Sequence, residues 1–242
     1  MEITASQTVG QVVAQDYRAA AVFRQSNIDF CCNGSQTIEV ACQQAGITPQ
    51  SVINAIHQAL TADRDGAAND YNAWPLDLLA DYIEKKHHRY IQSRITEIVP
   101  YLEKIRTVHG DRHPELISIE RLFLEAAGEL TAHMKKEELI LFPFIRKMVQ
   151  AQQQGGSLPA SRFGTVANPV AMMQHEHDAE GERFRQIATL SGNYNPPADA
   201  CNTYRVSFSL LREFEADLHL HIHLENNILF PKAIQLESEM PR

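Results

Sequence analysis

The chain has 242 residues and a formal net charge of −8. This acidic balance gives no reason to expect a nucleic acid or an anionic membrane as a partner, and no apolar run approaches the roughly 20 residues of a membrane span. Four cysteines in a chain this long do not make a disulfide framework, and the first residues lack the apolar core of a secretory signal. We therefore expect a cytoplasmic protein of one or two domains.

The first 62 residues have the pattern of a small helical domain. Apolar residues recur at helical spacing from Val9 to Phe23, which predicts one helix that ends near Asn27. An Asn-Gly pair at 33–34 predicts a turn. This turn follows a phenylalanine and two adjacent cysteines.

Two further helices complete the predicted N-terminal domain. The first covers roughly residues 37–44, and Gly46 stands where a helix C-terminus favours glycine. The second covers residues 48–62 and opens with a threonine cap and a proline in the first helical position. Residues 63–73 have no helical pattern of apolar residues and are predicted to form a linker.

Residues 74–236 contain four long helical patterns with apolar residues at steps of three and four. The first opens at Trp74, the second follows Pro114, the third begins near Pro169, and the fourth ends after Pro231. Polar segments connect them. The sequence therefore predicts an all-α fold, in which an up-down four-helix bundle follows the small helical domain.

One motif occurs twice within these patterns. His133 and Glu137 stand four residues apart, and the same spacing returns 88 residues later at His221 and Glu225. In both copies a proline follows ten residues after the histidine. Because positions i and i+4 share one face of a helix, each motif directs an imidazole and a carboxylate at one point. Such a pair suits a divalent metal ion, and two facing motifs suit two ions.

Two further histidines lie on the apolar faces of the bundle. His88 precedes His133 by 45 residues, and His177 precedes His221 by 44, so the bundle resembles one helix pair used twice. A single histidine on an apolar face is more often a hydrogen-bonded core residue than a ligand. Two buried carboxylates among four histidines are different, because unpaired ionised groups are costly inside a protein. The joint pattern therefore predicts a metal site.

The predicted ligands are His88, His133, Glu137, His177, His221 and Glu225. They include no thiolate, which disfavours a structural zinc site. Imidazole suits iron, zinc, copper and nickel, whereas carboxylates that bridge two ions suit paired iron or manganese. Glu137 and Glu225 are the natural bridges. Four histidines shared by two ions leave positions open for an oxo group, water or a small gas ligand.

Other histidines do not share the face of these ligands. They are His87, His175, His219 and His223. We interpret them as solvated or as outer neighbours of the ligands, with His87 and His175 as the alternatives to a chosen ligand. The histidines assigned to the surface are His57, His109 and His113.

Cys31 and Cys32 are adjacent, lie outside any helical stripe and precede the flexible Asn-Gly pair. We therefore expect both thiols to be exposed and able to bind metal, exchange disulfides or sense oxidants. The alternative is a pair of small apolar residues in a turn. A disulfide between the two is disfavoured because it strains the intervening peptide. Cys42 and Cys201 are interpreted as packing residues.

Residues 74–236 resemble the hemerythrin-like domains, with the six predicted ligands at the ligand positions of that family. The oxygen carriers among them have a fifth histidine and an aspartate, whereas Glu225 takes the role of the aspartate here. The closer resemblance is to the di-iron iron-sulfur cluster repair proteins. These join such a bundle to an N-terminal domain with a Phe/Tyr-Cys-Cys-x-Gly motif, present here at residues 30–34. The resemblance covers nearly the whole chain.

This resemblance implies two non-haem iron ions with oxo and carboxylate bridges, in a cytoplasmic stress-response protein that restores iron-sulfur clusters damaged by nitric oxide or peroxide. The implied partners are damaged iron-sulfur proteins, nitric oxide or oxygen as small ligands, and a second copy of the chain in a homodimer. Cys31 and Cys32 are implied to be redox or iron-transfer thiols. Glu129 and Glu176 match acidic positions near the site, on an iron or proton path.

Three functions remain open at this point. The first is repair by iron donation, the second is reduction of nitric oxide at the di-iron site, and the third is a sensor or carrier of oxygen or nitric oxide. The adjacent thiols argue against the third function, because a carrier does not need them. Nothing in the sequence separates the first two.

Overall fold

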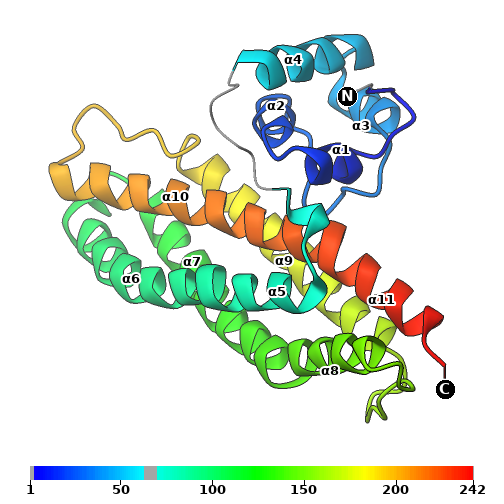
Figure 1. Cartoon of the computed structure of the whole chain (residues 1–242). Coiled ribbons are helices and arrows are strands. Elements are labelled where there is room, and N and C mark those ends of the chain that lie inside the picture. The colour runs from blue at the N-terminus through cyan, green and yellow to red at the C-terminus, as the bar shows by residue number, and fades with distance from the viewer. Residues whose placement is uncertain (1–2, 63–69, 242) are drawn as a thin grey trace.

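The computed structural model describes residues 3–62 and 70–241. A small helical domain at the N-terminus lies against a long helical bundle (Figure 1). Apart from an isolated bridge between Thr8 and Thr37, these two ranges contain no β-structure. The predicted all-α class, with a bundle preceded by a small helical domain, is therefore confirmed. Across the same ranges, every helix is too short or too polar to cross a bilayer.

The helices of the N-terminal domain are α1 (Val9–Gln15), α2 (Ala19–Gln25), α3 (Ile38–Ala45) and α4 (Pro49–Ala62). The prediction of one helix from Val9 to Asn27 is wrong. Asp16 leaves the helical conformation (φ −154°, ψ 110°) and ends α1. Its carboxylate accepts hydrogen bonds from the backbone and the guanidinium of Arg18. Such local bonding by an aspartate competes with the helix, which divides the predicted element in two.

The other two helices of this domain follow the sequence prediction. Thr37 caps α3 by accepting a hydrogen bond from the backbone N–H of Val40, and Gly46 ends it in the left-handed conformation at φ 69°. Pro49 begins α4. Of the predicted linker, residues 63–69 lie outside the described ranges. The chain re-enters at the short 3-10 helix η1 (Tyr71–Ala73), where Tyr71 is buried.

Within residues 70–241 the bundle consists of four long helical runs. The first is α5 (Leu76–Tyr82), η2 (Ile83–His88) and α6 (Arg89–His109). The second is α7 (Glu115–Lys136), η3 (Glu137–Leu141) and α8 (Phe142–Gln153). The third is α9 (Ala167–Leu190), and the fourth is α10 (Asn202–Leu224), η4 (Glu225–Leu229) and α11 (Phe230–Glu239). The fourth run ends after Pro231, as predicted, and continues to Glu239 because a proline in the first turn of a helical segment sacrifices no hydrogen bond.

The segments η2, η3 and η4 are π-helical turns, and each contains a predicted ligand. His88 ends η2, Glu137 begins η3, and Glu225 begins η4. In the last two, a phenylalanine N–H bonds to the glutamate carbonyl five residues earlier. The next residue is a proline, which has no N–H to form the usual α-helical bond, so the preceding turn is free to widen. Turns of this type are frequent at functional sites.

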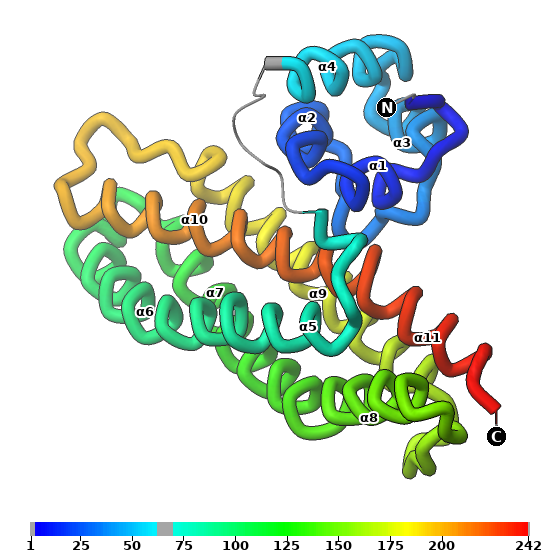
Figure 2. The backbone as a smooth tube through the Cα atoms, viewed as in Figure 1, coloured from blue at the N-terminus to red at the C-terminus, as the bar shows by residue number. Residues whose placement is uncertain are grey.

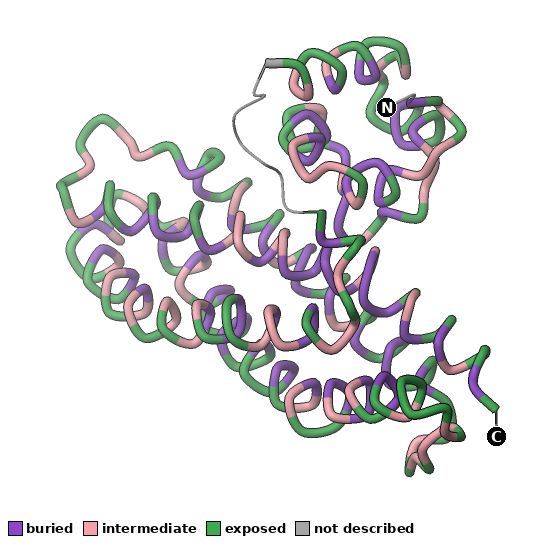
Figure 3. The backbone as a smooth tube through the Cα atoms, in the orientation of Figure 1, coloured by how far each residue is buried: buried purple, intermediate pink, exposed green. Residues whose placement is uncertain are grey.

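The N-terminal domain packs on the fourth run of the bundle (Figure 2). One continuous cluster of buried apolar side chains contains Phe23 and Phe30 from this domain and Phe214 and Leu218 from α10. In Figure 3 the buried positions follow the inner faces of the bundle helices and recur inside the N-terminal domain. The two parts therefore share a hydrophobic core, and this contact covers a face of α10 that the bundle alone would leave in water.

Candidate metal centre

Six side chains from the four helical runs meet in the core of the bundle. Two groups of four lie with their ligand atoms within 4.8 Å of one another. The first group is His88, Glu137, His221 and Glu225, and the second is His133, Glu137, His177 and Glu225. Both glutamates belong to both groups. The structure thus brings together all six side chains that the sequence indicates as ligands.

Glu137 lies between two imidazoles. Its Oε2 is 3.4 Å from Nε2 of His88 and 3.3 Å from Nε2 of His133, and the residue is 0% exposed. Neither carboxylate oxygen makes a well-formed hydrogen bond within the described residues. An ionised carboxylate in such surroundings is costly unless a cation compensates it. This orphaned carboxylate therefore fits a metal ion.

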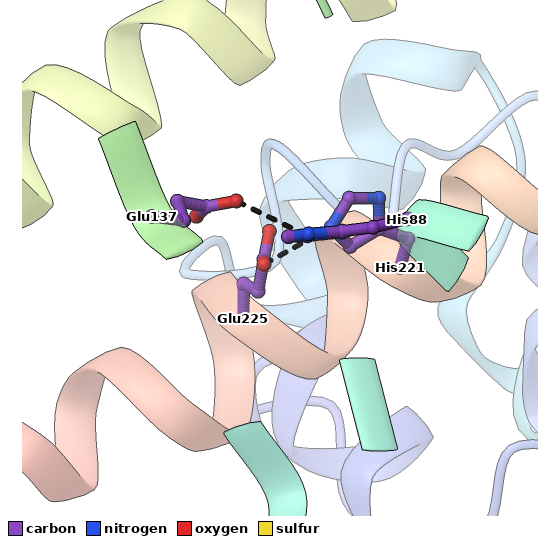
Figure 4. A group of neighbouring side chains, drawn as sticks. All are labelled: His88, Glu137, His221 and Glu225. Atoms are coloured by element: carbon purple, nitrogen blue, oxygen red, sulfur yellow. Dashed lines mark hydrogen bonds and ion pairs between the residues drawn. The ribbon is translucent and has the colours of Figure 1, made fainter. Parts of the chain in front are cut away.

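Glu225 has the same relation to the other two histidines. Its carboxylate oxygens lie 3.0 Å from Nε2 of His221 and 3.2 Å from Nε2 of His177. Figure 4 shows the carboxylates of Glu225 and Glu137 side by side, both directed toward the imidazoles. Burial opposes ionisation of the two glutamates, yet the neighbouring histidines lower the pKa of both carboxyl groups. Two negative charges therefore share a dry core.

The negative charge of the buried carboxylates changes the pKa of a neighbouring histidine. Burial opposes a positive charge on His133, but the carboxylates of Glu137 and Glu176 outweigh it and raise the pKa of His133 to about 10. Its Nε2 lies 3.0 Å from Nε2 of His177. Two imidazole nitrogens at this distance share a proton or bind a common cation. The donor set of imidazole and carboxylate, without sulfur, fits iron.

Outer contacts hold the imidazoles in the form that a metal ligand needs. Nδ1 of His88 is 3.1 Å from Oε1 of Glu138, and Nδ1 of His133 is 2.8 Å from Oε2 of Glu176. A carboxylate only accepts, so Nδ1 carries the proton and Nε2 faces the glutamates. His177 is held in the same way by the amide of Asn226, at 2.9 Å.

The adjacent thiols lie between the N-terminal domain and this centre. The carboxylate of Asp29 accepts hydrogen bonds from the backbone N–H groups of Cys31 and Cys32 and from the Cys31 thiol. Cys32 is half-buried, and its Sγ lies 3.5 Å from the carbonyl oxygen of His177, to which it donates. The thiol segment thus touches the backbone of a predicted ligand.

Comparisons with known proteins agree with this arrangement. A family model described as a domain of unknown function (DUF542) matches residues 5–60, and the hemerythrin HHE cation binding domain matches residues 79–233. The iron-sulfur cluster repair protein YtfE of Musicola paradisiaca is 35% identical over 96% of this chain and 97% of its own length. That of Yersinia pseudotuberculosis is 34% identical over 96% and 98%. The chain belongs to the YtfE family of iron-sulfur cluster repair proteins.

Several histidines that the sequence assigns either to solvent or to the outer neighbours of the ligands are buried in this YtfE-family chain. His87 is fully buried, stacks on His221 with ring centroids 5.8 Å apart, and holds its Nδ1 3.0 Å from Asp217. It lies beside the ligands but in neither group of four. His175, the other alternative ligand, is exposed. The structure thus places His88 and His177 in the groups of four and leaves His87 and His175 outside them.

The N-terminal domain also covers His223, which is buried, and His219, which is half-buried. The rings of His219 and His223 lie 6.0 and 6.1 Å from that of Phe30. Burial lowers the pKa of His223 to about 3, and burial together with the charge of Arg24 lowers that of His219 to about 4. Both rings are neutral at pH 7. Of the two predicted alternatives, solvated or outer neighbour of the ligands, the first is wrong for both residues. The contact between the domains that covers them is invisible in the periodicity of α10.

The same contact changes the prediction for the thiols. Cys31 is buried rather than exposed, and its hydrogen bond to Cys32 and its burial raise the pKa of the Cys31 thiol. Cys42 is buried, as predicted, whereas Cys201 is exposed and not a packing residue. Its Sγ lies 3.2 Å from Nε2 of His109, and this histidine is buried instead of lying on the surface.

The other histidines assigned to the surface are less deeply placed. His57 is exposed, and His113 is half-buried between Glu115 and Asp199. Of the two predicted acidic neighbours of the centre, Glu176 contacts His133, whereas Glu129 is exposed on α7.

Sequence reasoning missed two neighbours of the centre. Glu138 and Asn226 hold His88 and His177, and each directly follows a shared glutamate. They stand at matching places in the repeat, 88 residues apart. A comparison of the two copies beyond their ligands would have found them.

Proposed function

We propose that this protein binds two iron ions between its six buried side chains and restores damaged iron-sulfur clusters by supplying iron. The relatives named above are iron-sulfur cluster repair proteins, so damaged iron-sulfur proteins are the proposed clients. The observation that carries the metal site is the pair of ligand groups that share Glu137 and Glu225. The four free thiols fit the reducing cytoplasm as the site of action.

The two groups suggest how the ligands divide. His88 and His221 would hold one ion, His133 and His177 the other, and both glutamates would bridge them. Two histidines per ion leave coordination positions for an oxo bridge, water, or nitric oxide or oxygen as a small ligand. When bound, the ions supply exchangeable iron and the affinity for such ligands.

The residues of the chain prepare this centre and keep it dry. The rings of Phe142 and Phe230 stack against His88 and His177 at 5.6 and 6.1 Å. Both belong to the Phe-Pro pair that ends each copy of the repeated motif. They exclude water from the imidazoles, while the outer carboxylates hold the Nδ1 protons. We further propose that residues 1–62 and 74–236 act as two domains, the first presenting thiols and the second holding metal.

Reduction of nitric oxide at the same centre is the alternative. It would use the open coordination positions and would need electrons from another protein. The contact of Cys32 with the backbone of His177 favours iron donation, because it brings a metal-binding thiol to the edge of the centre. Steady consumption of nitric oxide with a reductant would identify an enzyme. A single-turnover loss of iron to an apo-cluster acceptor would identify a donor.

Replacing both Cys31 and Cys32 by serine is expected to leave the iron content unchanged and to impair repair. The six ligands include no sulfur, and the thiols belong to the other domain. The measurement is reactivation of a cluster enzyme damaged by nitric oxide, with wild-type and double-variant protein loaded with equal iron. Cys42→Ser, in the same domain, serves as the control that retains repair. Full repair by the double variant would remove these thiols from the mechanism.

A further inference from the structure

Asn226 joins the N-terminal domain to a ligand of the proposed metal centre. Its Nδ2 donates a hydrogen bond to the carbonyl oxygen of Cys31 at 3.2 Å, and its Oδ1 lies 2.9 Å from Nδ1 of His177. A carbonyl oxygen has no proton to give, so the amide must direct its NH2 group at Cys31 and its oxygen at His177. His177 is therefore protonated on Nδ1 and presents the lone pair of Nε2 to the metal site.

The counterpart of Asn226 in the repeat has no such connection. Glu138 holds His88 in the same way, but its second partner is Lys135 at 2.9 Å, within the bundle. A carboxylate is sufficient at position 138, because the side chain there only accepts hydrogen bonds, from His88 and Lys135. Position 226 needs a group that accepts from the imidazole and donates to a carbonyl, which an amide does and a carboxylate does not.

Neighbouring contacts hold the same short segment of the N-terminal domain. Asn227 donates to the carbonyl of Phe30 at 3.1 Å, and the Cys32 thiol donates to the carbonyl of His177. A cavity of about 220 Å³ gives small molecules access to this thiol. Its lining residues are Cys32, Ser35, Gln174, Asp178, Asn226 and Asn227. Cys32 is therefore both reachable and placed beside the amide that contacts the ligand.

We propose that Asn226 is a positioning residue that couples occupancy of the metal site to the hold on the Cys31-Cys32 segment. A metal ion on Nε2 makes the Nδ1–H of His177 a stronger donor. Hydrogen bonds in a chain polarise one another, so the bond from Asn226 to Cys31 is strengthened as well. Coupling between two sites is reciprocal. A client that displaces the thiol segment therefore weakens the support of His177 and eases the departure of iron.

The proposal rests on iron binding at the proposed centre and is tested by alkylation of Cys32. Iodoacetamide modifies iron-loaded and metal-free protein, and mass spectrometry gives the rate at Cys32 while elemental analysis gives the iron content. In the wild type, iron is expected to slow alkylation by up to about twofold, since polarisation adds about 10–30% to the strength of one hydrogen bond. Asn226→Asp keeps the acceptor for His177 and loses the donor to Cys31. It is expected to react quickly both without iron and when loaded with iron in excess metal.

Two further variants complete the test. Asn226→Leu removes both hydrogen bonds without adding charge, and it too is expected to lose the effect of iron on the Cys32 rate. Glu138→Gln, at the matching place in the repeat, is expected to retain it. Equal rates in loaded and metal-free wild type, or an iron effect that persists in both Asn226 variants, would overturn the coupling. Wild-type protein that takes up no iron would instead reject the proposed function, and the coupling with it.

Discussion

Glu137→Ala is expected to remove most of the bound iron. This carboxylate belongs to both ligand groups and is fully buried, so its loss takes an oxygen from both ions and leaves cationic charge uncompensated in the core. Loss of an outer partner of a metal ligand typically lowers affinity by about 10- to 100-fold. The loss of a shared ligand is expected to reach at least the upper end of that range. Iron per chain after dialysis against a weak chelator measures it.

His219→Ala is the matched control for this variant. His219 lies on the same helical run as Glu225, but its ring packs on Phe30 and not on the ligands. It belongs to neither group of four. We expect this variant to keep the full iron content. Equal loss of iron from the two variants would show that the assignment of inward and outward faces on these helices is wrong.

Gly34→Ala is expected to loosen the N-terminal domain from the bundle. A Cβ at this position would lie 2.8 Å from the carbonyl oxygen of Phe30 and closer still to Oδ1 of Asn227. The side-chain amide of Asn227 and the carbonyl of Phe30 also form the hydrogen bond that holds the Cys31-Cys32 segment on the bundle. Moving either group to relieve the clash therefore weakens this hydrogen bond. Overpacking of this kind costs about 1–3 kcal/mol. Hydrogen exchange at residues 28–36 and the thermal unfolding temperature report it.

Gly128→Ala provides the comparison for that substitution. Gly128 lies inside α7, and a Cβ there would meet nothing within 4 Å. Alanine is favoured over glycine inside a helix by about 1 kcal/mol, so this variant is expected to be slightly more stable than the wild type. The contradicting outcome is that Gly34→Ala unfolds at the wild-type temperature, with unchanged hydrogen exchange at residues 28–36. The close contact between Gly34 and Asn227 would then contribute nothing to stability.

The role of Gly34 shows where prediction from the sequence ends. The Asn-Gly pair predicts a turn, and a turn is present. The φ angle of Gly34 is not in the left-handed region, however. The need for glycine comes instead from Asn227, 193 positions further along the chain. Local patterns hold no information about such a contact, and the burial of Cys31 is missed for the same reason.

The meeting of the six side chains in the bundle core could be predicted because their signal is local and repeated. The spacing of His133 and Glu137 places both on one face of a helix, and the second copy 88 residues later removes coincidence. Helix boundaries were less accessible. The break at Asp16 depends on a bond between its carboxylate and Arg18, which the apolar pattern does not reveal.

The iron content of the purified protein tests the central claim most directly. Protein expressed in iron-rich medium is analysed for iron, zinc and manganese, and the metal amount is divided by the chain concentration. The proposed pair of sites, which share Glu137 and Glu225, predicts two iron ions per chain. One zinc ion per chain, or no metal, would contradict it.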